Sequence, residues 1–152
     1  MKEIRRAENA GFCFGVKQAI EKAEKAAEQN PGEIYSMGSL IHNVRVTRDL
    51  EKRGIRVIES LDEISAPGMV KDVPLRDATP KVIIRSHGEG RALYQKAEER
   101  GIVLIDATCP FVARIHHLVN DTDKQVVIVG DRNHPEVLGI SGWCRKDRKS
   151  VV

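Results

Sequence analysis

The chain alternates short runs of β-branched residues with longer amphipathic stretches. Five runs predict strands, and residues 3–7 form a weaker sixth candidate; the five are residues 33–37, 55–59, 81–85, 102–105 and 125–129. The amphipathic stretches between them predict helices. Strands that alternate with helices are typical of βαβ units, so the pattern predicts an α/β fold with a parallel sheet.

Local signals mark where the predicted helices begin and end. Four apolar residues at spacings of four, three and four give the first helix one apolar stripe: Val16, Ile20, Ala23 and Ala27. The Asn-Pro-Gly sequence at 30–32 ends that helix. Asn43 is placed to cap a second helix, and Gly54 and Gly101 stand where helices give way to strands.

Two segments fall outside this pattern. Residues 65–80 contain three prolines and one glycine without a sustained period, which predicts a long surface loop. Residues 145–152 carry four basic side chains and one acidic one, whereas residues 1–144 are neutral overall. We therefore expect a solvated, frayed basic end, and no basic surface for nucleic acid on the folded part.

Composition narrows the class of protein. With 152 residues, 41% of them hydrophobic and only 4% aromatic, the chain suits one compact α/β domain or two small lobes. No apolar run approaches the roughly 20 residues needed to cross a bilayer. The charged N-terminus lacks the apolar core of a secretory signal, so we expect a cytoplasmic protein with its three cysteines reduced.

Polar side chains with useful chemistry follow four of the predicted strands. His42, His87, Cys109 and His134 each come just after a strand end. Ligands of open parallel sheets bind at the carboxyl edge of the strands. A single histidine is more often an ordinary surface or core residue, but four such placements together favour a ligand site at this edge.

Cys13 and Cys109 each lie directly ahead of a predicted helix, and Pro110 favours a helix start after the second. The positive end of a helix dipole stabilises a thiolate, which is the form that binds metal. Both residues are therefore candidate metal ligands. Free cysteine is also a common small core residue, and the two interpretations stay open on the sequence pattern alone.

Glu136 follows His134 by two residues, so an imidazole and a carboxylate share one turn. These are the groups most used for proton transfer near neutral pH. Glu136 is equally suited to stabilise the start of its own helix. His116 and His117 are adjacent and point in different directions, so we treat them as structural or exposed residues.

Five motifs, taken together and in order, resemble those of 4-hydroxy-3-methylbut-2-enyl diphosphate reductase. They are Ala-Gly-Phe-Cys-Phe-Gly-Val at 10–16, Gly-Ser-Leu-Ile-His-Asn at 38–43, Arg-Ser-His-Gly at 85–88, Asp-Ala-Thr-Cys-Pro at 106–110 and Asn-His-Pro-Glu-Val at 133–137. Enzymes of that family are about twice as long. The chain therefore resembles an N-terminal half.

The resemblance implies a three-lobed α/β fold around a [4Fe-4S] cluster held by three cysteines. Residues 1–109, including the N-terminal strand, would form the first lobe, 110–144 part of the second, and 145–152 the basic tail. Cys13 and Cys109 match two of the cluster ligands. The third ligand belongs to a later motif that this chain lacks, and Cys144 does not match it.

The resemblance also assigns the remaining site residues. His42, His87 and His134 match the histidines that bind the substrate's diphosphate, and Glu136 matches the proton-donating glutamate. The implied reaction removes the substrate hydroxyl as water and yields isopentenyl and dimethylallyl diphosphates for isoprenoid biosynthesis. A ferredoxin or a flavodoxin would supply the electrons.

Two other functions compete with a reductase. One is an inactive α/β fragment that binds diphosphate but holds no cluster. The other is a zinc hydrolase built from the same histidine, cysteine and glutamate side chains. The hydrolase is the weaker alternative, because the sequence contains no HExxH motif or comparable ligand spacing.

Overall fold

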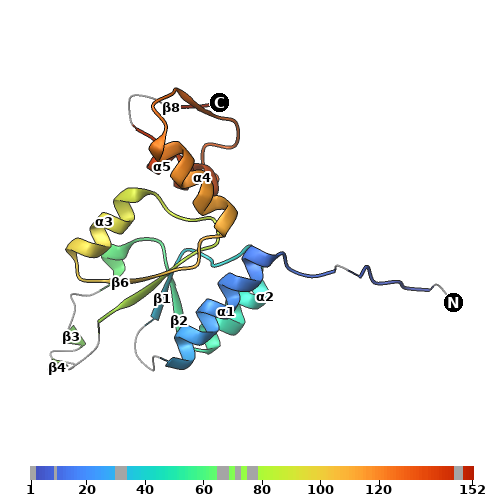
Figure 1. Cartoon of the computed structure of the whole chain (residues 1–152). Helices are drawn as coiled ribbons and strands as arrows, with labels where there is room; N and C mark the ends of the chain where they lie inside the picture. Colours follow the sequence, from blue (N-terminus) through green and yellow to red (C-terminus); the bar gives the residue numbers. More distant parts are fainter. Residues whose placement is uncertain are drawn as a thin grey trace.

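The computed structural model describes residues 3–8, 10–29, 34–64, 69–70, 73–74, 79–145 and 149–152. Its elements follow one another along the chain as shown in Figure 1: α1 (Phe14–Gln29), β1 (Ile34–Met37), α2 (Val44–Lys52), β2 (Ile55–Ile58), the 3-10 helix η1 (Leu61–Glu63), β3 (Met69–Val70), β4 (Val73–Pro74), β5 (Lys81–Ile84), α3 (Arg91–Glu99), β6 (Val103–Asp106), α4 (Pro110–Asp121), β7 (Val126–Ile128), α5 (Pro135–Trp143) and β8 (Lys149–Val151).

The main sheet has four parallel strands in the order β2-β1-β5-β6. Ile34 lies opposite both Ile55 and Lys81, and Lys81 lies opposite Val103. The carboxyl ends of all four strands therefore point to the same edge. The parallel α/β fold predicted from the sequence is confirmed, and so are the five main predicted strands.

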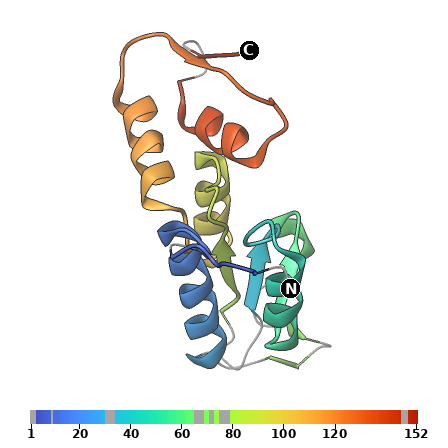
Figure 2. The same ribbon diagram turned by 90° about the vertical axis from the view of Figure 1, so that its right-hand side faces the viewer.

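Helices cover both faces of this sheet (Figures 1 and 2). On one face the strands pack against α1 and α2, in a core that includes Ala19, Ala23, Ile34, Leu50, Ile55 and Ile83. On the other face they pack against α3 and η1, in a core that includes Tyr35, Leu61, Val82, Ile84 and Ala97. Neighbouring residues of one strand thus serve opposite cores, as expected for a parallel sheet buried on both sides.

The predicted helix signals are present in the structure. The Asn43 side chain accepts hydrogen bonds from the backbone N–H groups of Arg45 and Val46, and so caps α2. Gly54 and Gly101 have positive φ angles of 91° and 64° after α2 and α3. These local signals fix the direction in which each helix enters and leaves the sheet.

A second group of elements lies beyond the carboxyl edge of the main sheet (Figure 1). Helices α4 and α5 pack against each other, and β7 pairs in parallel with β8. The expectation of a frayed basic end is wrong for residues 149–151, because backbone pairing to β7 orders them. Val152 donates to Ile128 O and accepts from Gly130 N, both at 2.9 Å. The lobe boundary at residue 109 stays a prediction.

Two further expectations are corrected. Residues 3–7 form no strand; they lie in an arm that runs away from the body, where Ile4 is 95% exposed (Figure 1). A strand requires a partner, and no described segment lies beside this arm. Within the expected loop at 65–80, β3 and β4 pair antiparallel over two residues each. The remainder of that loop up to residue 78 lies outside the described residues.

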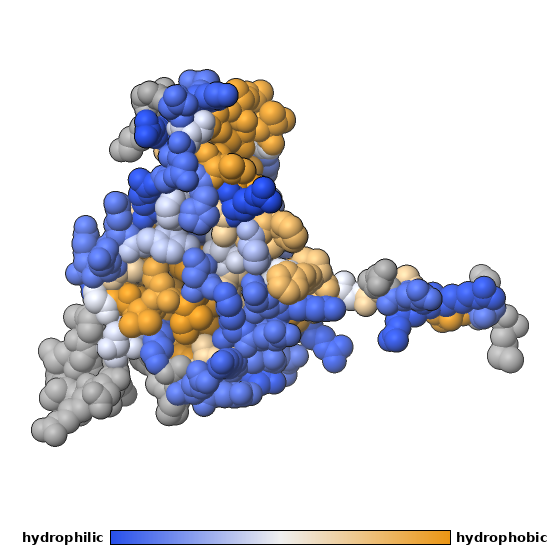
Figure 3. Space-filling view, in the orientation of Figure 1, coloured by the Kyte–Doolittle hydropathy of each residue, from blue (hydrophilic) through white to orange (hydrophobic). Residues whose placement is uncertain are grey.

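Apolar side chains also reach the surface. Figure 3 shows an apolar patch around the C-terminus, where Val127, Val129 and Val152 of the β7–β8 region are largely exposed. Among the described helices, none combines the length and apolarity that a bilayer crossing requires. The patch belongs to the β7–β8 region, whose valines are not covered by any other described residues.

Candidate functional site

Backbone hydrogen bonds join the loops that follow β1, β5 and β6. The carbonyl oxygen of Leu40 accepts from both the N–H and the hydroxyl of Ser86, each at 3.3 Å. The carbonyl oxygen of Ser86 in turn accepts from the N–H of Cys109 at 2.9 Å. The three loops therefore form one connected edge. Cys109 is itself one of the bonded residues, His87 is one residue from Ser86, and His42 is two residues from Leu40.

Three histidines from separate parts of the chain lie together at this edge. The ring centroids of His42 and His87 are 4.6 Å apart, those of His87 and His134 are 5.7 Å apart, and those of His42 and His134 are 6.2 Å apart. His42 and His87 come from the main sheet, whereas His134 precedes α5 in the second group of elements. The cluster therefore spans both parts of the molecule.

His87 is the half-buried member of the cluster. Burial lowers its pKa to about 4, and the nearby His42, Arg85 and His134 act in the same direction. Its Nδ1 atom is buried and has no hydrogen-bond partner. His87 is thus uncharged at neutral pH. A bound anion would accept hydrogen bonds from the ring N–H groups of this cluster and would raise the pKa of its imidazoles.

His134 is the N-cap residue of α5, and its Nδ1 atom accepts the backbone N–H of Glu136 at 3.3 Å. In this arrangement the ring proton of a neutral His134 sits on Nε2. The exposed ring can then donate to a ligand while its other nitrogen caps the helix. Glu136 lies in the first turn of α5, where the helix dipole favours a carboxylate.

Both candidate metal ligands are associated with the start of α1: Cys13 precedes it in the chain, and Cys109 lies against its first turn. Cys13 directly precedes this helix and is exposed, and Cys109 is the N-cap of α4 and partly exposed. A Cβ atom on Gly15 would lie 2.5 Å from Cys109 Sγ, so the first turn of α1 rests against that sulfur. Only glycine at this position leaves room for the Cys109 thiol beside the helix that follows Cys13.

A hydrogen-bond network holds the turn that carries Cys109. Asp106 accepts the backbone N–H of Thr108 at 2.8 Å and the Tyr94 hydroxyl at 2.9 Å. Lys22 donates to the carbonyl oxygen of Asp106 at 2.7 Å. Burial, reinforced by the Asp106 charge, raises the pKa of Tyr94, which therefore remains a neutral donor.

Cys144 lies elsewhere and in a different environment. It follows α5, is buried, and its thiol donates to the carbonyl oxygen of Ile140 at 3.4 Å. Burial raises its pKa. A buried, protonated thiol is a poor metal ligand. That Cys144 lies outside any cluster stays a prediction.

Arg85 and Glu89, which flank His87 in the sequence, form an ion pair that the predictions from the sequence do not include. Arg85 Nη2 lies 2.6 Å from Glu89 Oε1, and both side chains are mostly buried. A Cβ atom on Gly38 would lie 2.7 Å from Arg85 Nη1, so the guanidinium packs on the turn after β1. The sequence does show opposite charges four residues apart around His87, which is a signal for an ion pair. That this pair is buried could be seen only in the folded structure.

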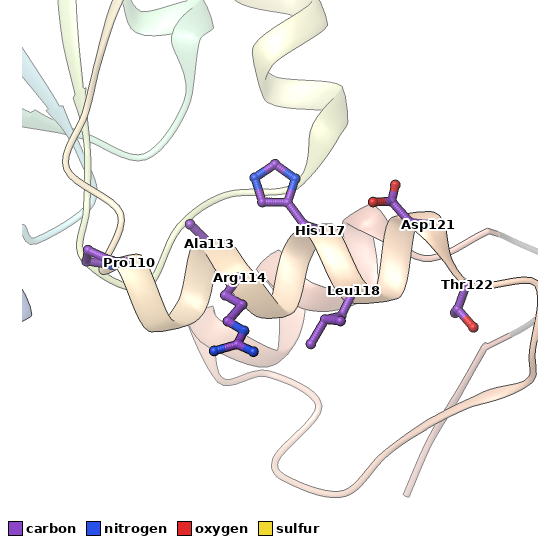
Figure 4. A pocket seen from close by; sticks show the side chains of 7 residues that line it. All are labelled: Pro110, Ala113, Arg114, His117, Leu118, Asp121 and Thr122. Atoms are coloured by element: carbon purple, nitrogen blue, oxygen red, sulfur yellow. The ribbon is translucent and has the colours of Figure 1, made fainter.

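Surface hollows flank the site without containing the whole cluster. One runs along α4 and is lined by side chains of that helix and its C-cap: Pro110, Ala113, Arg114, His117, Leu118, Asp121 and Thr122 (Figure 4). A second hollow, at the start of α2, includes His42, Asn43 and Arg48. The α4 hollow has walls from one helix only, so it is a shallow surface feature.

The described residues contain no group of three or more histidine, cysteine or acidic side chains that could hold a metal ion. The adjacent histidines on α4 are structural and exposed, as expected, because His116 is buried and His117 lies on the surface. The geometry thus brings three imidazoles together and bonds the Cys109 turn to the same edge.

Comparison with known proteins settles the family. A family model described as LytB protein matches residues 4–152. The chain belongs to the LytB family. The resemblance in the motifs is therefore confirmed over nearly the whole sequence.

Several curated relatives carry the name 4-hydroxy-3-methylbut-2-enyl diphosphate reductase. The protein from Caldanaerobacter subterraneus subsp. tengcongensis is 45% identical over 99% of this chain and 50% of its own length. That from Clostridioides difficile is 38% identical over 93% of this chain and 47% of its own length. This LytB chain spans about half the length of these relatives.

Solved structures share the fold. The reductase structure from Plasmodium falciparum superposes with a TM-score of 0.82 at 28% identity, over 95% of this chain and 42% of that one. A second structure, of the enzyme described as the terminal one of the non-mevalonate pathway, gives a TM-score of 0.73 at 34% identity, over 96% and 49%. The LytB chain thus has the fold of the part of each structure that it covers.

Proposed function

We propose that this chain is the N-terminal half of a 4-hydroxy-3-methylbut-2-enyl diphosphate reductase, an oxidoreductase of isoprenoid biosynthesis. In this proposal His42, His87 and His134 bind the diphosphate, Glu136 donates a proton, and Cys13 and Cys109 bind a [4Fe-4S] cluster. The observation that carries the proposal is the cluster of three imidazoles, with ring centroids 4.6 to 6.2 Å apart, joined by backbone bonds to the Cys109 turn.

The imidazole cluster suits a diphosphate. A diphosphate requires several donors, and three rings at this spacing can each donate one N–H to a different oxygen. The N-terminus of α5, which His134 caps, adds the positive end of a helix dipole. The chain therefore needs no large basic surface to bind this anion, which agrees with the neutral charge of residues 1–144.

The thiols suit two of the three positions of an iron–sulfur cluster. Thiolates are the usual ligands of such clusters, and Gly15 leaves the space in which Cys109 Sγ sits beside the first turn of α1. A cluster bound there would supply the electrons and the Lewis acidity that removal of a hydroxyl group requires. The third thiolate would come from the part of the longer family proteins that this chain does not cover.

In this proposal Glu136 moves a proton. Its position two residues after His134, at the start of the same helix, supports the role, because a diphosphate bound to His134 would lie near this turn. In the overall reaction two electrons and two protons enter, the C–O bond of the hydroxyl breaks, and water leaves. A ferredoxin or flavodoxin would be the electron source.

One observation favours the second candidate, a diphosphate-binding fragment without a cluster. Among the described residues, no group of three or more histidine, cysteine or acidic side chains has the geometry to hold a metal ion. Such a fragment would keep the histidine cluster and its hydrogen-bonded loops, because these need no cluster to form. The same residues would then bind diphosphate without catalysing its reduction.

Anaerobic reconstitution with iron and sulfide, followed by an absorption spectrum and iron analysis, separates the two candidates. The reductase proposal predicts a brown protein with substoichiometric iron, whereas the fragment stays colourless. Calorimetry with inorganic diphosphate tests the histidine site in both cases, with His134→Ala as the control variant. A wild-type chain that binds neither iron nor diphosphate would overturn the proposal.

A further inference from the structure

Helix α5 carries proposed site residues at one end and a dense set of contacts at the other. His134 caps its N-terminus, and Trp143 is its last residue. The Trp143 indole N–H donates to the carbonyl oxygen of Glu89 at 2.8 Å. The Arg91 guanidinium lies over the same ring, 5.2 Å from its centroid. The C-terminal end of α5 is therefore fastened to the segment that follows His87.

His116 of α4 also packs on Trp143. Its buried ring stacks on Trp143, with centroids 5.6 Å apart and planes 20° from parallel. A Cβ atom on Gly88 would lie 2.5 Å from His116 Cε1. Gly88 also has a φ of 72°, so glycine is required there both by conformation and by the imidazole that rests against it.

Glycines on α5 let the helix approach the same loop closely. A Cβ atom on Gly142 would lie 2.6 Å from the Cα atom of Gly90. One on Gly139 would lie 3.4 Å from the carbonyl oxygens of both His87 and Gly88. Backbone therefore meets backbone along this contact, and little room is left for α5 to slide past the His87 loop.

From these contacts we propose that Trp143 and His116 are positioning residues. They hold the C-terminal end of α5 against residues 87–91, and the rigid helix transmits that position to its other end. A helix of this length extends about 13 Å, so a small rotation at Trp143 displaces His134 and Glu136 relative to His87. The effect on ligand binding rests on the proposed function. The positioning of α5 by Trp143 and His116 does not, because it depends only on contacts within this chain.

The contact can fail without unfolding the main sheet. The two cores of that sheet contain neither Trp143 nor His116. Helix α5 would still pack on α4, and Lys149 would still donate to the carbonyl oxygen of Ser141 at 2.9 Å. Loss of the Trp143 contact should therefore loosen His134 against His87 while the first sheet keeps its structure.

NMR tests the placement directly. The His87 and His134 rings, 5.7 Å apart, should show an NOE in the wild-type chain. The NOE should vanish in Trp143→Leu and in His116→Ala, and should persist in Trp143→Phe, which keeps a ring to stack. Leu61→Ala, in the core beside α3, is the control, because it lowers stability without touching α5. An NOE that is absent from the wild type, or survives in Trp143→Leu, overturns the proposal.

Affinity for inorganic diphosphate gives a second readout. Trp143→Leu should weaken binding by about tenfold, because the three imidazoles are no longer held in one arrangement before binding. Leu61→Ala should leave the affinity unchanged at a temperature where both variants are folded. A wild-type chain that shows the NOE but binds neither diphosphate nor iron would overturn the proposed function and leave the positioning role intact. Equal affinities for Trp143→Leu and Leu61→Ala would overturn that role.

Discussion

The backbone N–H of Cys109 donates to the carbonyl oxygen of Ser86 at 2.9 Å, and this one bond links the thiol turn to the residue before His87. Ser86 also donates to Leu40, two residues before His42. The proposed iron-binding and diphosphate-binding positions thus share one hydrogen-bonded edge. A displacement of either position would strain the other, so the two are placed as a unit.

The three cysteines should differ in their effect on iron. Cys13→Ser and Cys109→Ser should each abolish iron binding after anaerobic reconstitution, because each removes one of two thiolates at the same corner. Cys144→Ser should keep the wild-type iron content, since that thiol is buried and bonded to Ile140. Iron analysis of the three variants checks this. Loss of iron in Cys144→Ser, with iron retained in Cys13→Ser, would refute the ligand assignment.

Gly15→Ala should disturb the same corner. The added methyl group would lie 2.5 Å from Cys109 Sγ, so either the thiol or the first turn of α1 must move. We expect a loss of about 1–3 kcal/mol in stability, as for other overpacked sites, together with loss of iron binding. Thermal unfolding and iron analysis measure the two effects. Lys17→Ala, on the exposed side of α1, should change neither, and wild-type iron in Gly15→Ala would contradict the close contact.

The roles of Glu136 and His134 can be separated in a chimera that joins this chain to the second half of the Caldanaerobacter relative. Glu136→Gln keeps the shape but removes the titrating proton, so kcat should fall by about 10²-fold or more with KM nearly unchanged. His134→Ala should instead raise KM, because it removes a donor to a charged oxygen.

The helix-dipole interpretation of Glu136 makes a different prediction for the same chimera. If the carboxylate only stabilises the start of α5, Glu136→Gln should cost about 0.3–1 kcal/mol of stability and leave kcat near the wild-type value. Steady-state kinetics and thermal unfolding of the two variants distinguish these outcomes. An unchanged kcat in Glu136→Gln would remove this residue from the proposed chemistry.

Stability should fall as the pH drops from about 6.5 towards 4. Burial lowers the pKa of His87 from 6.5 to about 4, so the unfolded chain takes up a proton in this window that the folded chain does not. The stabilising effect of neutral His87 is complete above pH 6.5 and is lost as the pH falls to about 4. Burial also lowers the pKa of His116, which adds to the loss in the same direction.

Urea unfolding at about pH 7 and about pH 5 measures this dependence. His87→Gln should reduce the difference in the free energy of unfolding between the two pH values, because the buried titrating ring is gone. His117→Gln is the matched control, since that ring is exposed on α4, and it should keep the wild-type difference. An identical pH dependence in wild type and His87→Gln would show that His87 titrates alike in the folded and unfolded chains.

The sequence by itself determined the features that depend on neighbouring residues. The β-branched runs gave the main strands, Asn43 and Pro110 marked helix starts, and Gly54 and Gly101 marked helix ends. Each of these signals acts within a few residues along the chain. Because strands separated by helices pair in parallel, the common edge for His42, His87 and Cys109 also followed from the sequence.

Only the tertiary structure decided the features that join distant residues. Strand β8 exists because β7 offers it a partner, while residues 3–7, a weaker strand candidate, have no partner among the described residues. The stacking of His116 on Trp143 and the burial of the Arg85–Glu89 pair depend on how α4 and α5 dock on the first sheet. Local periodicity reports which face of an element is apolar, but it carries no information on which other element covers that face.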